Sequence, residues 1–169
     1  MLTQRYPQQF IRAAQRAALF GVIIAFFAML SGTLSDTLAE MRRDTLTIIT
    51  GSGEHTFDIE VAEAGEDKSR GLMFRQSLAD NAGMLFPYQP AQEITMWMKN
   101  TYISLDMVFI RSDGVVHRVT TGTEPFSEAV IASGGDVIAV LEIRAGIATK
   151  IGLKAGDRVV HPLFQVPAK

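Results

Sequence analysis

Polar residues interrupt an apolar part of the chain in the run Met96-Trp97-Met98-Lys99-Asn100-Thr101. Because buried polar groups need hydrogen-bond partners and buried charges need counter-charges, these side chains serve either a ligand or the fold. In the functional interpretation they line a binding cleft, where the apolar ring of Trp97 stands beside the ammonium of Lys99 and the amide of Asn100. Tryptophan and arginine are preferred anchors of binding surfaces. The predicted ligand-binding residues are Trp97, Lys99 and Asn100, with Arg75 as a second cation and Asp106 in support.

The same residues have a structural interpretation. Polar side chains near strand ends commonly satisfy local backbone groups, which is the role that Asn100 and Thr101 would have here. Lys99 and Asp106 would then form a buried pair. The sequence leaves both interpretations open.

Two carboxylates form a second candidate group. Asp106 and Glu142 each lie in or beside an apolar strand, and two carboxylates in different environments can divide acid and base roles, as in glycoside hydrolysis. That chemistry needs the two groups within about 5–10 Å of each other, which the sequence does not establish. Alternation along the strand predicts that Glu142 points to an outer face.

The chain lacks the ligands of common metal and cofactor sites. It has no cysteine, and its three histidines are isolated rather than placed at metal-ligand spacing. Met96 and Met98 would share one strand face and could bind Cu(I), but methionine is also an ordinary filler of irregular cores. G-x-S-x-G and glycine-rich phosphate loops are missing. We therefore expect no metal and no cofactor.

The length and charge of the chain limit the remaining classes of function. A chain of 169 residues has room for one domain, and its formal net charge of −2 comes without a basic stripe. Nucleic-acid binding needs such basic surface, so we expect no nucleic-acid partner.

The first 39 residues have the three parts of a secretory signal. Three arginines precede the uncharged run 17–30, and small and polar residues ending at Ala39 follow it. We expect cleavage before Glu40 and a periplasmic or extracellular mature domain, residues 40–169. The alternative is an uncleaved anchor helix, although fourteen helical residues span only about 21 Å of a hydrocarbon core near 30 Å. A lipid anchor is not expected, because Thr33 occupies the position of the required cysteine.

Short β-rich runs separated by turn residues fill the rest of the chain. They predict a mainly β fold, a compact antiparallel sandwich or barrel-like domain with one or two short helices. Asp113-Gly114 is the strongest hairpin signal. The expected strands are 46–50, 55–61, 83–86, 94–98, 106–112, 115–121, 137–143 and 158–160, with helices within 64–74 and 145–153.

An ordered series of motifs resembles a known family. Arg70-Gly71-Leu72-Met73-Phe74-Arg75, Gly83-Met84-Leu85-Phe86 and Trp97-Met98-Lys99-Asn100-Thr101 lead into Leu105-Asp106 and Val140-Leu141-Glu142. The series is similar to the bacterial and archaeal family called domain of unknown function 192 across residues 55–161. The resemblance implies a mainly β sandwich and frequent export, and it implies no reaction. Met96 and Ser104 depart from the usual pattern, and the first departure argues against a copper site.

Together these features predict a non-catalytic periplasmic domain that binds an anionic or sugar-like envelope ligand. One alternative is an enzyme that acts on envelope polysaccharide through Asp106 and Glu142. Another is a protein–protein module of the envelope, for which an exposed apolar patch would be the sign.

Overall fold

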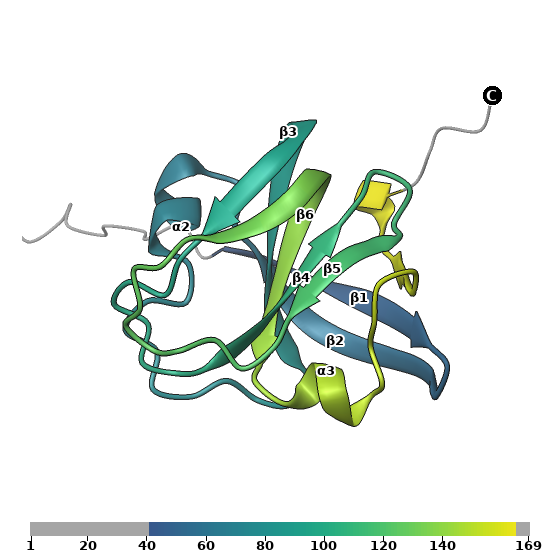
Figure 1. The fold of residues 1–169 in the computed structure, drawn as a ribbon, viewed down its shortest axis with the longest axis horizontal. Helices are drawn as coiled ribbons and strands as arrows, with labels where there is room; N and C mark the ends of the chain where they lie inside the picture. Colours follow the sequence, from purple (N-terminus) through teal and green to yellow (C-terminus); the bar gives the residue numbers. More distant parts are fainter. Residues whose placement is uncertain (1–40, 165–169) are drawn as a thin grey trace, which may run out of the picture. The chain divides into compact units, whose positions relative to one another are not determined.

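Seven strands form a single sheet in residues 41–164, the part of the chain that the computed structural model describes (Figure 1). The sheet curves into a half-barrel with strand order β5-β4-β6-β3-β2-β1-β7. The strands are β1 (Arg42–Thr50), β2 (Gly53–Val61), β3 (Ala82–Met96), β4 (Leu105–Ile110), β5 (Val116–Thr120), β6 (Ile131–Arg144) and β7 (Arg158–Val160). The helices are α2 (Gly65–Arg70) and α3 (Ile147–Lys150), followed by a 3-10 turn at Pro162–Phe164. The predicted mainly β class with two short helices is confirmed.

The expected signal segment, residues 1–39, lies outside the described residues. Among residues 41–164 no helix is long and apolar enough to cross a bilayer.

One strand pair departs from the antiparallel arrangement. β2 and β3 are parallel, with Asp58 opposite Ala82 and Val61 opposite Leu85. A parallel pair needs a crossover connection, and α2 with the loop that follows it provides one. All other pairs in the sheet are antiparallel.

The longest strand joins two segments that the sequence separates. β3 continues through Pro87 and Pro90 to Met96, and its register against β6 shifts between Pro87 and Gln92. Proline has no N–H for the ladder, so it is tolerated at such an irregularity. The prediction that a strand stops at Pro87 is therefore wrong, because β6 is long enough to pair with β3 on both sides of the shift.

The hairpin between β4 and β5 forms at Asp113-Gly114, as expected. Gly114 has φ +78°, and a Cβ atom there would lie 2.6 Å from the carbonyl oxygen of Val159. The Asp113 side chain accepts a hydrogen bond from the backbone N–H of Val115, at 3.0 Å. This turn therefore requires glycine for its conformation and for its close contact with β7.

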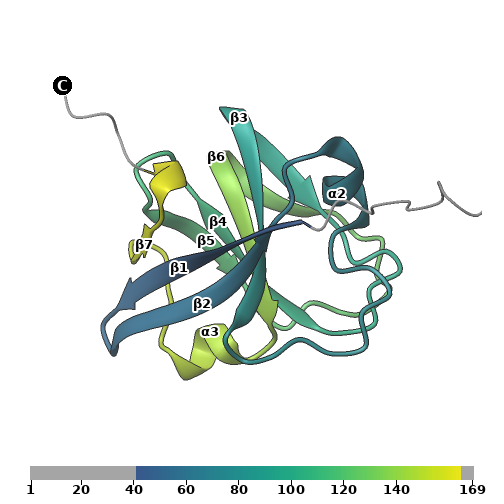
Figure 2. The ribbon, with the colours of Figure 1, turned by 180° about the vertical axis from the view of Figure 1, so that it is seen from behind.

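Both faces of the central strands are covered by apolar residues, which form two cores. The first core lies between the central strands and β1, β2, β7 and α3, and it includes Leu141 and Ile143 of β6. The second core lies under the loops near α2, and it includes Met107 and Val140. Figures 1 and 2 show α2 and these loops at one side of the half-barrel, away from α3. Every residue of β4 is buried, because β4 contributes to both cores.

Candidate functional site

A small cavity opens at the edge of the second core. Its volume is about 30 Å³, roughly the share of one water molecule in the liquid. Residues 68–73, at the end of α2 and in the following turn, form one wall. Met96, Trp97, Lys99 and Thr101 form the other wall, with Phe86 and Glu142 inside. We call this cavity the Glu142 pocket.

Glu142 is buried on the second-core face of the sheet. It lies opposite Met84 of β3 and Met107 of β4, and only 5% of its surface is exposed. Burial disfavours the charged form and raises the pKa of Glu142 to about 8. The side chain is therefore a neutral carboxylic acid at pH 7. The prediction that Glu142 points to an outer face is wrong, because β6 has no outer face at this position.

The carboxyl group of Glu142 has no hydrogen-bond or ion-pair partner among residues 41–164. Its neighbours in the two flanking strands are methionines, and the pocket is the open space beside it. Its oxygens are not sealed, since Thr120 Oγ1 is the only fully enclosed side-chain N or O atom without a partner in residues 41–164. A neutral carboxylic acid can donate one hydrogen bond and accept others, so a water molecule or a ligand atom in the pocket could satisfy it.

Basic residues surround the mouth of the pocket. The Lys99 ammonium lies 5.4 Å from the ring centre of Trp97, and the Lys68 ammonium lies 4.8 Å from that of Tyr88. Burial, followed by the nearby charge of Glu142, raises the pKa of Tyr88, whose ring lies under the ammonium of the lining residue Lys68. Arg70 contributes a third cation to the lining. The mouth is therefore positive while the base is a neutral acid.

The structure brings two of the predicted site residues to this pocket. Trp97 and Lys99 line it together, and Trp97 remains half-exposed. Asn100 is not part of the lining, although its amide nitrogen lies 3.9 Å from the sulfur of Met73, which is. Asn100 instead shapes the turn, since it has φ +53° and its carbonyl accepts a hydrogen bond from the N–H of Phe74.

Arg75 does not reach the pocket. Its guanidinium group binds both carboxylate oxygens of Glu60, at 2.8 and 2.5 Å. This hydrogen bonding lowers the pKa of Glu60 and raises that of Arg75. The bidentate pair joins β2 to the loop after α2, so the predicted second cation serves the fold.

Asp106 lies on the opposite face of the sheet from Glu142. Along β4 it alternates with residues of the second core and shares its face with Val108 and Ile110 of the first. Its two carboxyl oxygens accept hydrogen bonds from the backbone N–H groups of Gly122 and Ala148, at 2.8 and 2.9 Å. The structure therefore corrects two expectations: Asp106 neither supports the cleft nor pairs with Lys99.

The carboxylate pair of the enzyme interpretation is likewise separated. Asp106 and Glu142 belong to neighbouring strands but project from opposite faces, so one substrate cannot contact both. Lys68 and Arg70 were missed because nothing in the sequence links α2 to the tryptophan segment. Glu142 could have been found from its apolar neighbours on both sides, which indicate a strand buried on both faces.

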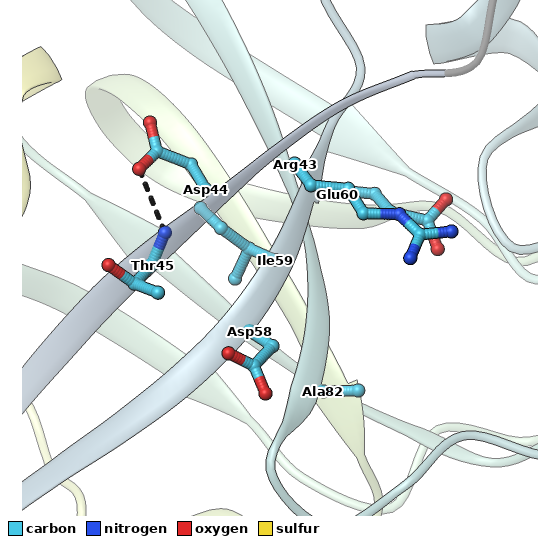
Figure 3. Close-up of a pocket in the computed structure, with 7 residues that line it drawn as sticks. All are labelled: Arg43, Asp44, Thr45, Asp58, Ile59, Glu60 and Ala82. Carbon is cyan, nitrogen blue, oxygen red and sulfur yellow. Dashed lines mark hydrogen bonds between the residues drawn. The ribbon is translucent and has the colours of Figure 1, made fainter.

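A wider concavity lies over β1 and β2, with a volume of about 580 Å³ (Figure 3). Figure 3 shows Asp44 accepting a hydrogen bond from the N–H of Thr45, at 2.8 Å. Glu60 is bound to Arg75, and Asp58 accepts a hydrogen bond from the side chain of Asn81. These acids are already satisfied, so the concavity offers a ligand less than the Glu142 pocket does. Among residues 41–164 no group of three histidines or acids is placed to hold a metal ion.

Comparison with known proteins identifies relatives of the chain. The family model DUF192, described as "Uncharacterized ACR", matches residues 47–161. A solved structure from Sinorhizobium meliloti 1021, described as a "putative transcription regulator", is 38% identical with a TM-score of 0.70, and the match covers 72% of this chain and 95% of that one. A protein of unknown function from Novosphingobium aromaticivorans DSM 12444 is 35% identical with a TM-score of 0.71, covering 73% and 89%. No curated protein matches the chain.

Proposed function

The chain belongs to the DUF192 family, and we propose that it acts as an exported, non-catalytic domain that binds a small anionic ligand in the Glu142 pocket. The observation that carries this proposal is the buried carboxyl group of Glu142, which has no partner among residues 41–164 and lines a cavity. A satisfied acid such as Asp106 would need no ligand. An unsatisfied acid at a pocket is more readily explained by a bound group than by stability.

The chemistry of the pocket selects the ligand class. Neutral Glu142 can donate its O–H to an oxygen of the ligand, and Lys99, Lys68 and Arg70 at the mouth attract negative charge. The exposed face of Trp97 offers an apolar surface beside them. The cavity itself admits a group no larger than a water molecule, so one ligand oxygen enters and the rest stays at the mouth. A carboxylate, either free or on an acidic sugar, has these properties.

Export of the domain is part of the proposal. It is supported by the basic residues and the apolar run of the first 39 residues. N-terminal sequencing of the protein recovered from a periplasmic fraction would test it. We expect the chain to begin at Glu40, and recovery of the intact N-terminus from the cytoplasm would contradict export.

Two other functions are less well supported. The polysaccharide enzyme would need Asp106 and Glu142 on one substrate, and they occupy opposite faces. A role as a transcription regulator, as the Sinorhizobium relative is described, has little support in this chain, because its net charge of −2 gives little attraction to a nucleic-acid backbone.

Fluorescence of Trp97 tests the ligand proposal directly, because it is the only tryptophan in the chain. Glucuronate and acetate are titrated at about pH 6, with uncharged glucose as the control. We expect a saturable change of emission with the two carboxylates, and an affinity at least tenfold weaker above pH 9, where Glu142 has lost its proton.

Two variants of Glu142 refine this experiment. Glu142→Gln keeps a hydrogen-bond donor and should bind at both pH values, whereas Glu142→Met has no donor and should not bind. An absence of saturable change with either carboxylate, or unaltered binding by Glu142→Met, would show that the pocket is not the site.

A further inference from the structure

Three exposed aromatic rings gather on the loops that cover the second core. Phe74, Tyr102 and Phe126 are 54%, 39% and 57% exposed. The rings of Phe74 and Tyr102 meet edge to face with centres 6.2 Å apart, and those of Tyr102 and Phe126 are tilted with centres 5.1 Å apart. We call these three residues the aromatic patch. None of them lines the Glu142 pocket.

The backbone holds two of these rings in an unfavourable conformation. Phe74 has φ +64° and Phe126 has φ +62°, in the left-handed region that bulky residues avoid. Within residues 41–164, Asn100 is the only other non-glycine residue with positive φ, and its carbonyl binds the N–H of Phe74. The N–H of Phe126 binds the carbonyl of Thr101 at 3.2 Å. Hydrogen bonds from one loop therefore fix both strained residues.

Burial does not explain the strain. A phenylalanine at positive φ could be retained for its packing, but more than half of each side chain is in contact with solvent. Strained backbone that presents exposed side chains is more often found where a surface has a partner. The aromatic patch therefore indicates an interaction surface that is separate from the ligand pocket.

The size of the patch argues for a narrow partner. An aromatic side chain contributes about 150–250 Å² when it is buried, so three half-exposed rings offer roughly 300 Å². A stable interface between two globular proteins takes about 800 Å² from each partner. The patch is therefore too small to hold a second copy of the chain or a folded domain by itself, but it is wide enough for an extended segment.

The charges beside the patch are acidic. Glu124 and Glu128 flank Phe126, both are exposed, and neither forms an ion pair with another residue of 41–164. The neighbouring Arg75 is bound to Glu60, so its charge is compensated there. A partner that reaches this side of the patch would gain from carrying a positive charge.

We propose that the aromatic patch binds a proline-rich segment of a partner protein, with a basic residue of that segment beside Glu124 and Glu128. Proline-rich segments keep an extended polyproline II conformation and dock between aromatic rings with little loss of conformational entropy. Phe74, Tyr102 and Phe126 contact one another in a row, and their exposed surfaces offer successive positions on which proline rings can stack.

The test uses the full chain and a fluorescein-labelled oligoproline peptide ending in two arginines. Fluorescence anisotropy should show saturable binding. The same oligoproline ending in two glutamates should bind at least tenfold more weakly, as should a glycine–serine peptide ending in two arginines.

Variants locate the binding surface. Phe126→Asn removes one ring and keeps a residue that tolerates positive φ, so its thermal midpoint should be unchanged or raised while peptide affinity falls at least tenfold. The double change Glu124→Gln and Glu128→Gln should weaken only the arginine peptide. Glu142→Met serves as a control for the separate pocket and should bind both peptides like the wild type.

Three results would overturn the proposal. The first is no peptide binding at millimolar concentration, or equal binding by Phe126→Asn. The second is that the protein sediments with phosphatidylcholine vesicles but does not bind the peptides, and that Phe126→Asn abolishes the sedimentation. This result would make the patch a membrane contact. The third is a dimer in light scattering that Phe126→Asn converts to a monomer, which would make the partner a second copy.

Discussion

Asp106 and Glu142 are two buried acids on neighbouring strands with opposite surroundings. Asp106, on the first-core face, accepts hydrogen bonds from two backbone N–H groups that belong to separate parts of the chain. Glu142, on the second-core face, has methionines across both flanking strands and no hydrogen bond from residues 41–164. A carboxyl group thus stabilises the fold on the first-core face of the sheet, whereas on the second-core face a carboxyl group remains available to bind a ligand.

This difference separates structural from functional burial. A carboxyl group with two amide donors stabilises the loops it joins, here the turn at Gly122 and the first turn of α3 at Ala148. A carboxyl group without protein donors costs free energy unless water or a ligand in the pocket binds it. The comparison therefore assigns Asp106 to stability and Glu142 to binding, and each assignment predicts a different response to mutation.

Removal of Asp106 should have the largest effect. Asp106→Ala leaves the buried N–H of Ala148 and the N–H of the exposed Gly122 without their acceptor, and we expect a loss of about 2–4 kcal/mol in the free energy of unfolding. Asp106→Asn keeps one acceptor oxygen and should lose less. Urea denaturation monitored by circular dichroism measures both variants. A loss below about 1 kcal/mol for Asp106→Ala would remove the contrast with Glu142.

The pH dependence of stability should reveal the titration of Glu142. Its pKa is about 8 in the folded protein against an ordinary value of 4.5, so between these values the folded chain holds a proton that the unfolded chain has released. Stability should therefore fall as pH rises through this window, by up to about 1.4 kcal/mol per pH unit, and level off above pH 8. Asp44 and Glu60 have lowered pKa values and act in the opposite direction only at more acidic pH.

Glu142→Gln is the matched control for this measurement. The amide does not titrate, so the difference between the wild-type and variant urea curves isolates the proton of Glu142. Parallel pH profiles for the two proteins would mean that Glu142 is already ionised and has a partner when folded.

Replacement of Glu142 by an apolar side chain should stabilise the protein. Glu142→Met fits a site flanked by Met84 and Met107 and removes the unsatisfied carboxyl group. We expect a gain of about 1–2 kcal/mol at pH 5, where the wild-type side chain is uncharged, together with the loss of carboxylate binding. A destabilised variant would instead show that Glu142 holds the fold through a bridging water.

The fold class followed from alternation and turn signals, which are local properties of the sequence. The expected strand 55–61 lies within β2, where Phe57, Ile59 and Val61 are the buried residues, and the Asp113-Gly114 hairpin forms. The parallel pairing of β2 with β3 could not be predicted in this way. It depends on where the chain returns after α2, which is a long-range property.

The candidate site was predicted only in part. Trp97 and Lys99 lie in one sequence segment and meet in the pocket, so local spacing identified them. Glu142 comes from a distant strand, and alternation misplaced it because a strand buried on both faces has no solvent side. Asp106 was misassigned because the sequence cannot show which face of β4 an acid occupies or which backbone N–H groups lie within hydrogen-bond distance of it.

Replacement of Lys99 by alanine should have the smallest effect on stability. It tests the contrast between structural and binding residues at the pocket. Its ammonium stacks on the half-exposed ring of Trp97, and such exposed cation–π contacts contribute about 0.5–1 kcal/mol. For a domain of this size that corresponds to a shift of the thermal midpoint by roughly 2–6 °C at most. Arg75→Ala, which breaks the bidentate pair with Glu60, is the comparison variant and should lower the midpoint at least as much. Lys99→Ala should nevertheless weaken carboxylate binding at the pocket where Arg75→Ala does not. A larger drop for Lys99→Ala than for Arg75→Ala, with carboxylate binding intact, would move Lys99 to the structural side of the comparison and leave Lys68 and Arg70 as the cations of the pocket.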